Sequence, residues 1–185
     1  MARQRSEESR QAILAAALEL LRQHSYREMT TDAIAMAAGV GKQTIYRWWK
    51  TKADVVLDAL AEHAREVVAP ETGSLEGDVR AFFEVTVRLV RGSRGSGPVL
   101  RGLMAEAQLD AAFAPRFAAF IETRRAALAA VLARHARGTS DIDVMVDMLF
   151  GAMWYRLLVG HRPLDAAFSA RLGALAASGL SDGGA

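Results

Sequence analysis

The sequence contains no cysteine among its 185 residues. This absence excludes a disulfide-stapled scaffold and a cysteine-ligated zinc site, and it fits a reducing compartment. Long apolar runs are also missing, because charge-free stretches such as residues 148–155 are far shorter than the ~20 residues that span a bilayer. No apolar run follows the basic start MARQRSEESR, as a signal peptide requires. The sequence therefore predicts a cytoplasmic protein without a membrane partner.

Neither sign of charge is in large excess. Lys and Arg together number 23 and Asp and Glu 21, so the formal net charge is +2. A balance this close predicts no class of partner, and any electrostatic argument depends on where the charges lie. With 51% hydrophobic and 24% charged residues, the composition is typical of folded globular proteins.

Strand periodicity is not sustained anywhere, whereas helical periodicity recurs along most of the chain, so we predict an all-α fold. The first predicted helix spans residues 6–23, with Ser6 as its N-cap, preceded by a basic arm that contains Arg3 and Arg5. Three further helices are expected before residue 70. Pro70 and the stretch PETGSLEG after it mark the predicted internal boundary.

Sequence patterns of catalysis and metal binding are lacking too. The chain has no evident Ser-His-acid or paired-carboxylate pattern, and its four histidines lack the i, i+4 spacing of a helical zinc site. We therefore predict no catalytic residue, no metal site, no cofactor and no enzymatic activity.

The most informative stretch is AGVGKQTIYRWWKTK, residues 38–52, which has four basic residues, no acidic residue and three aromatics. Stepping 100° per residue from an inward-facing Ile45 places Trp49 near the same side of a helix. The opposite arc carries Gln43, Tyr46, Arg47 and Lys50, with Thr44 at its edge. Gln, Arg and Thr are side chains that read base edges in the major groove, and Tyr, Lys and Arg also contact phosphates.

A short helix, a turn at Gly39 and a second short helix match the helix-turn-helix arrangement. Such a turn also occurs in proteins that never bind DNA, so a solvated basic helix remains the alternative on spacing alone. The series TTDAIAMAAGVGKQTIYRWWKTKADV, however, closely resembles the DNA-binding domain of TetR-family transcriptional repressors, and the resemblance covers about residues 8–60. The matching positions are Thr30, Ile34, Ala35, Ala38, Gly39, Val40, Thr44, Ile45, Tyr46, Trp49 and Lys52.

Two positions depart from the family pattern: Gly41 stands where Ser is frequent, and Trp48 where a smaller or polar residue is usual. The resemblance implies that Ile45 and Trp49 are core residues and that Thr30 and Thr31 begin the first helix of the motif near phosphate. The implied phosphate contacts are Thr31, Tyr46 and Lys52, and the implied groove-facing residues are Lys42, Gln43, Thr44 and Arg47.

The resemblance also implies the organisation of the chain. We predict a helix-turn-helix DNA-binding domain in residues 1–52, a connecting helix in 53–70, and a helical regulatory and dimerisation domain in 71–185. The implied partners are a double-stranded DNA operator, a second copy of the chain, and a small-molecule effector whose binding releases DNA. Candidate effector-lining residues, each equally compatible with core packing, are Phe83, Met104, Phe113, Phe117, Met148 and Trp154.

The predicted helix at residues 141–159 has apolar residues on several sides, which a small bundle covers either by a central position or by a second subunit. We expect this helix and the segment 116–137 to form a four-helix dimer interface. The expected function is that of a ligand-responsive repressor. Two alternatives are a constitutive dimeric DNA-binding protein without an effector, and a small-molecule enzyme with an incidental helix-turn-helix.

Overall fold

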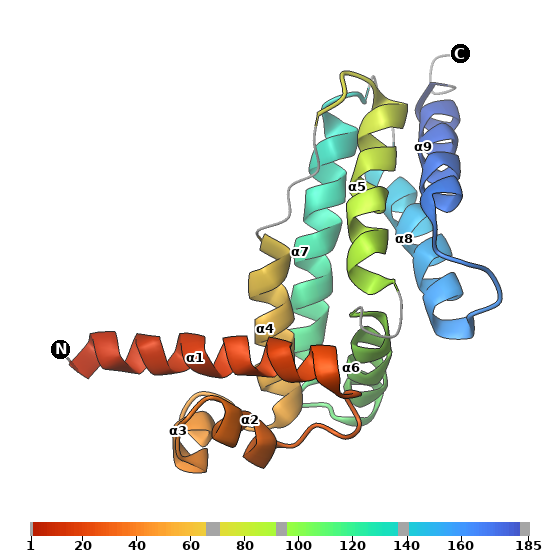
Figure 1. The fold of residues 1–185 in the computed structure, drawn as a ribbon. Helices are drawn as coiled ribbons and strands as arrows, with labels where there is room; N and C mark the ends of the chain where they lie inside the picture. The colour runs from red at the N-terminus through yellow and green to blue at the C-terminus, as the bar shows by residue number, and fades with distance from the viewer. Residues whose placement is uncertain (1, 66–70, 92–95, 137–140, 182–185) are drawn as a thin grey trace. The chain divides into compact units, whose positions relative to one another are not determined.

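The computed structural model describes residues 2–65, 71–91, 96–136 and 141–181, and within these ranges all regular secondary structure is helical (Figure 1). The predicted all-α fold is therefore confirmed. In chain order the helices are α1 (Ala2–Gln23), α2 (Thr31–Ala37), α3 (Lys42–Tyr46), α4 (Lys52–Arg65), α5 (Leu75–Val90), α6 (Gly97–Leu109), α7 (Ala114–Ala133), α8 (Ile142–Val159) and α9 (Ala166–Ser181).

The first helix is longer than the capping pattern predicted. It begins at Ala2, so Ser6 lies inside α1 and is not its N-cap. The segment with Arg3 and Arg5, which we expected to form an arm ahead of the helix, is itself helical. One side of the helix is buried, with Ile13 and Ala17 both 0% exposed.

The chain divides into two compact units that do not follow sequence order. The first unit combines residues 1–66 with residues 92–120, and the second combines residues 67–91 with residues 121–185. Helix α6 and the first turns of α7 thus pack with α1–α4. The predicted boundary near Pro70 falls within residues 66–70, which lie outside the described residues.

The first unit is built around α1 and α4, which pack against each other, and α2 and α3 pack against α1. Figure 1 shows the two short helices together on one side of α1. Buried residues of α4 complete this core, with Val55, Val56 and Ala59 all 0% exposed. Helix α6 contacts α4 within the same unit.

The second unit has its own core, in which α5 packs along α9. At its centre the rings of Phe82, Phe83 and Phe150 meet edge to face, with centroids 5.4–6.1 Å apart, a favourable arrangement for aromatic pairs. Close approach of α9 to α5 depends on Gly173, since a β-carbon there would collide with the backbone carbonyl of Glu76.

A buried carboxylate joins the start of α5 to the end of α7. Asp78 is 2% exposed and accepts hydrogen bonds from Thr72 N at 2.6 Å, from Thr72 Oγ1 at 2.8 Å and from Arg134 at 3.1 Å, with His135 Nε2 at 2.8 Å. Burial by itself raises the pKa of Asp78. The bonds from His135, Thr72 and Arg134 outweigh that effect and leave the pKa well below its usual range.

Candidate nucleic-acid interface

The turn between α2 and α3 forms because its backbone groups are satisfied locally. Thr30 caps α2, its Oγ1 accepting from Ala33 N at 3.1 Å. At the other end, Gly39 adopts a φ of +65°, and Gly39 N and Val40 N donate to the carbonyls of Met36 at 3.2 Å and Ala35 at 3.0 Å. This is a Schellman termination, which favours glycine at the left-handed position.

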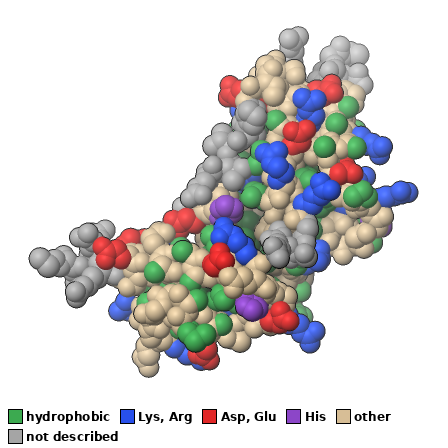
Figure 2. Space-filling model, viewed as in Figure 1, with side chains coloured by type: hydrophobic (Ala, Val, Ile, Leu, Met, Phe, Trp, Pro, Cys, Tyr) green, Lys and Arg blue, Asp and Glu red, His purple; other side chains and the backbone are tan. Residues whose placement is uncertain are grey.

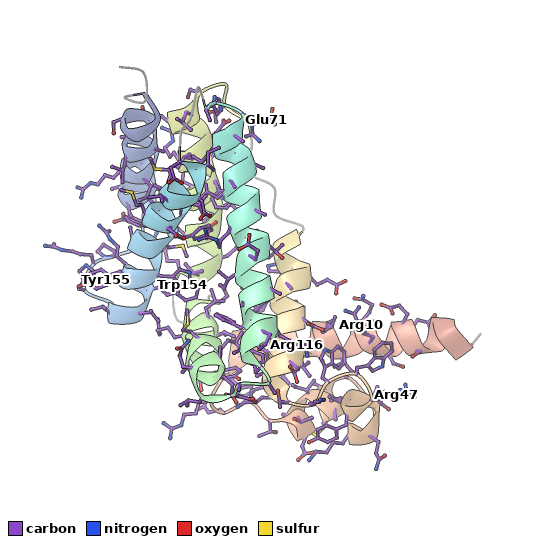
Figure 3. The ribbon with its side chains drawn as sticks, turned by 180° about the vertical axis from the view of Figure 1, so that it is seen from behind. Arg10, Arg47, Glu71, Arg116, Trp154 and Tyr155 are labelled. Carbon is purple, nitrogen blue, oxygen red and sulfur yellow. The ribbon has the colours of Figure 1, made fainter. Side chains whose placement is uncertain are left out.

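Helix α3 buries one face and exposes the other. Ile45 is 1% and Trp49 2% exposed, so both are core residues as predicted. On the opposite side Gln43 and Arg47 are exposed, Tyr46 is 50% exposed, and Thr44 is half-buried at the edge. Figure 3 shows Arg47 on the outer side of α3. The helix ends at Tyr46, with Arg47 as its C-cap.

The two positions that depart from the family pattern are both accounted for. Gly41 is the N-cap residue of α3 and, having no side chain, makes no capping hydrogen bond. Trp48 is 41% exposed, with its ring centroid 6.3 Å from that of Trp49. Trp48 therefore lies at the surface beside the exposed face of α3.

Lys42 has an acidic partner that sequence reasoning missed. Its Nζ lies 2.8 Å from Asp32 Oδ1 and 5.9 Å from the centroid of the Tyr46 ring, and the hydrogen bond to Asp32 raises the pKa of Lys42. Both side chains of the pair are exposed, so the bridge contributes little to stability. A phosphate that binds Lys42 must compete with Asp32.

Lys52 already binds main-chain carbonyls. Its ammonium donates to the carbonyls of Tyr26 and Met29, each at 2.9 Å, and lies 4.6 Å from the centroid of the Tyr26 ring. These bonds tie the first turn of α4 to the connection between α1 and α2. An ammonium has three donors, so one remains for an anion; the predicted phosphate contact stays a prediction.

Charges on the surface are mixed. On the face shown in Figure 2, basic and acidic side chains are interspersed rather than gathered in one large patch. The residues predicted to contact DNA all lie in the first unit, on α2 and its N-cap, on α3 with its C-cap, and at the start of α4: Thr30, Thr31, Lys42, Gln43, Thr44, Tyr46, Arg47 and Lys52.

The predicted effector-lining residues are divided between the units. Met104, Phe113 and Phe117 belong to the first unit, and Phe83, Met148 and Trp154 to the second. Phe83 is 0% exposed and Trp154 is half-buried against the second core, whereas Met148 is 51% exposed on α8. An exposed Met148 is poorly suited to line an enclosed pocket within one protomer.

Within the described ranges, none of the helices is both long enough and apolar enough to cross a membrane. The same residues contain no group of three or more His, Asp or Glu side chains placed to hold a metal ion.

Comparison with known families matches both parts of the chain. A family model described as "Bacterial regulatory proteins, tetR family" matches residues 13–59, which include the second half of α1, all of α2 and α3, and the first part of α4. A second model, "Tetracyclin repressor-like, C-terminal domain", matches residues 69–176.

Individual relatives match over most of their length. An uncharacterized HTH-type transcriptional regulator of Bacillus subtilis, YdeS, is 33% identical over 164 residues, covering 85% of this chain and 82% of the relative. The DNA-binding transcriptional repressor TetR of Mycobacteroides abscessus is 31% identical over 91% of both chains. Among solved structures, the TetR family transcription regulator SCO0332 is 31% identical with a TM-score of 0.82, covering 93% of this chain and 98% of that one. The chain therefore belongs to the TetR family of transcriptional regulators, with a helix-turn-helix DNA-binding domain near its N-terminus.

Proposed function

We propose that the protein is a ligand-responsive repressor that binds a palindromic operator as a homodimer. The observation that carries the DNA-binding part is the two-sided character of α3, in which Ile45 is buried while Gln43 and Arg47 are exposed. Gln pairs with an adenine edge and Arg with a guanine edge in the major groove. We assign base reading to Gln43 and Arg47, groove contact to Lys42 and Thr44, and phosphate contact to Thr30, Thr31, Tyr46 and Lys52.

Selection of bound sequences from a random DNA pool tests this proposal. The wild-type chain should enrich a palindromic motif, and Gln43→Ala and Arg47→Ala should each relax one position of the half-site at a cost of about 1–3 kcal/mol. Arg88→Ala is the matched control, because it removes the same charge from an exposed position on α5. Enrichment of no motif, with binding that only weakens with salt, would favour a DNA-binding protein that does not read sequence.

The dimer surface that we propose is the exposed apolar face of α8. Five large apolar side chains there are 47–60% exposed in the protomer, and at 100° per residue they fall within one arc: Val144, Met148, Tyr155, Leu158 and Val159. Figure 3 shows Tyr155 and Trp154 on different sides of α8, and Trp154 packs on the core. Gly151 lies on the same arc, and a β-carbon there meets open space. On α9, which packs against α8, Leu175 is 42% exposed.

This assignment changes the partner that we predicted for α8. We expected the segment 116–137 because of its many apolar residues, but Phe117, Leu128 and Leu132 are at most 4% exposed inside the protomer. Exposed positions of α7 are instead mostly alanine, including Ala126, Ala127 and Ala130. We therefore propose α8 with α9, not α8 with α7, as the interface.

Sedimentation of Met148→Glu tests the interface. Because Met148 is half exposed in the protomer, the substitution should leave the fold intact while placing a charge in the contact, so the dimer should dissociate to monomer. Leu109→Glu, on α6 where Leu109 is 88% exposed, is the control and should remain dimeric. If both variants sediment as dimers, the exposed apolar face of α8 is not the interface.

We further propose that an effector binds residues 71–185 and favours a conformation with weaker operator affinity. Family membership supports this step. One fold neighbour, a FadR of Bacillus subtilis at 18% identity and a TM-score of 0.67, was solved in complex with stearoyl-CoA. Half-buried Trp154 offers a fluorescence probe, and stearoyl-CoA is a suitable first compound for titration against the operator complex. If a broad set of apolar compounds leaves operator affinity unchanged, the constitutive dimeric DNA-binding protein becomes the better description.

A further inference from the structure

Residues 49–51, in the connection between α3 and α4, are held by two carboxylates of α4. Asp58 Oδ2 accepts the indole N–H of Trp49 at 2.8 Å. Asp54 Oδ2 accepts from the backbone N–H of Thr51 at 2.9 Å and from its hydroxyl at 3.1 Å, while Thr51 Oγ1 accepts from Asp54 N at 3.2 Å. The second set is a reciprocal capping box at the start of α4. The two carboxylates thus fix both ends of the segment that follows the recognition helix.

One guanidinium joins these two carboxylates. Arg116 Nη1 donates to Asp54 Oδ1 at 2.6 Å, and Arg116 Nη2 donates to Asp58 Oδ1 at 2.8 Å. Each carboxylate therefore uses one oxygen for the connection and the other for Arg116. Figure 3 shows Arg116 at the start of α7, beside α4.

Charge makes this arrangement costly to disturb. Asp54 is 5% exposed, and it lies one helical turn from Asp58, so without Arg116 a buried carboxylate would face a like charge at i, i+4. Charge-assisted hydrogen bonds from a planar guanidinium are strong and directional. Removal of Arg116 should therefore loosen both carboxylates and, with them, the Trp49 indole.

Helix α7 contributes to both units. Residues 114–120 belong to the first unit, whereas Leu128, Val131 and Leu132 farther along the same helix lie in the core of the second. Helix α7 continues without interruption from residues of the first unit to residues of the second. Arg116 stands in the first turn of this shared helix.

We propose that Arg116 is a positioning residue for the recognition helix: from α7 it holds Asp54 and Asp58, and through them it fixes the orientation in which α3 meets DNA. The proposal rests on the proposed DNA-reading function of α3. It assigns to α7 an effect on the recognition helix that passes through Asp54 and Asp58 of α4.

The test compares Arg116→Ala and Arg116→Lys with Arg88→Ala as the charge-matched control. Hydrogen exchange of the Trp49 indole N–H, assigned by its loss in Trp49→Phe, reports on the Asp58 bond without any DNA. We expect exchange to accelerate about tenfold or more in Arg116→Ala and to be unchanged in Arg88→Ala. Lysine is a point charge without a fork and cannot hold both carboxylates in the same geometry, so Arg116→Lys should fall between them.

Operator affinity is the second measurement. Arg116→Ala should bind the selected operator about tenfold more weakly than Arg88→Ala does. The affinity of Arg116→Ala for random DNA should stay within about twofold of the Arg88→Ala value. The two differ because misplacement of α3 weakens base contacts more than it weakens phosphate attraction. Indole exchange and operator affinity equal to those of Arg88→Ala would overturn the proposal. If Arg116→Ala fails to fold, the same comparison in Arg116→Lys decides. A wild-type protein that selects no operator would contradict the proposed function, whereas the indole exchange would still decide the role of Arg116.

Discussion

Gly102 on α6 packs against Tyr26 within the first unit, and Gly102→Ala is a direct test of that contact. A β-carbon on Gly102 would overlap Tyr26 Cδ1 and lie 2.9 Å from Cε1 and 3.2 Å from Cγ. The ring has little room to retreat, because Tyr26 is 9% exposed and the Lys52 ammonium lies 4.6 Å from the ring centroid. The added methyl group must therefore displace a buried ring.

Two opposing contributions set the size of the effect. Overpacking a well-packed site costs about 1–3 kcal/mol, and an aromatic ring as the colliding group places this site near the upper end of that range. Replacing glycine by alanine inside a helix returns about 1 kcal/mol. The net loss in the free energy of unfolding should be about 1–2 kcal/mol, which corresponds to a fall in Tm of about 2–8 °C for a chain of this length.

Urea unfolding at one fixed protein concentration measures this loss, because the proposed dimerisation would make apparent stability depend on concentration. Ala105→Gly, at an exposed position of the same helix, measures the helix-propensity contribution alone. Combining Gly102→Ala with Tyr26→Leu should recover about 1 kcal/mol or more relative to the sum of the single losses. If Gly102→Ala instead stabilises the protein by about the amount that Ala105→Gly destabilises it, the ring offers no resistance and the reasoning fails.

Three further expectations concern stability. Because the pKa of Asp78 is lowered in the folded state, its ionised form stabilises the fold fully above about pH 5 and progressively less as pH falls through the unfolded value of about 3.9. The difference in unfolding free energy between wild type and Asp78→Asn should therefore shrink over that pH interval. A constant difference would contradict this role of Asp78. The Tyr26 hydroxyl is buried and has no hydrogen-bond partner among the described residues. Tyr26→Phe should therefore leave the free energy of unfolding unchanged or raise it by up to about 1 kcal/mol. A clear loss of stability would indicate a hydrogen bond between Tyr26 and Glu106. Gly173→Ala should lower the free energy of unfolding by more than Gly102→Ala does, about 2 kcal/mol or more by urea unfolding. The reason is that the colliding atom is a backbone carbonyl oxygen of α5, which cannot rotate away. An equal or smaller loss would mean that α9 shifts freely along α5.

The two faces of α3 were predictable because they depend on local periodicity alone. Apolar Ile45 and Trp49 are four residues apart, which is about one helical turn, so any helix through them buries both on one side. The polar face follows from the same geometry. Glycine at position 39 likewise predicts the end of α2, since its left-handed φ is a local requirement.

Other features of the site depend on contacts that no local pattern encodes. Lys52 matched a family position for phosphate, yet its ammonium binds carbonyls that lie 26 and 23 residues earlier in the chain. Asp32 and Lys42 meet across the glycine turn, and Arg116 meets Asp54 across 62 residues. Side chains this far apart come together only when helices pack, so sequence periodicity carries no signal for them.

The apolar residues of α7 and α8 are a second case in which the sequence does not say what tertiary packing buries. Their number led us to predict that a second subunit covers both helices, and it carries no information on which apolar residues the protomer itself buries. The structure buries the large residues of α7 and leaves an exposed arc on α8.

The sequence by itself therefore determined the all-α class, the helix-turn-helix with its buried and exposed faces, and the family, because each depends on short-range spacing and residue type. Tertiary structure alone decided the two compact units, the apolar surface left on α8, and the contacts of Arg116 with Asp54 and Asp58. These depend on which distant helices bury one another and on which ionic groups that packing brings within hydrogen-bonding distance.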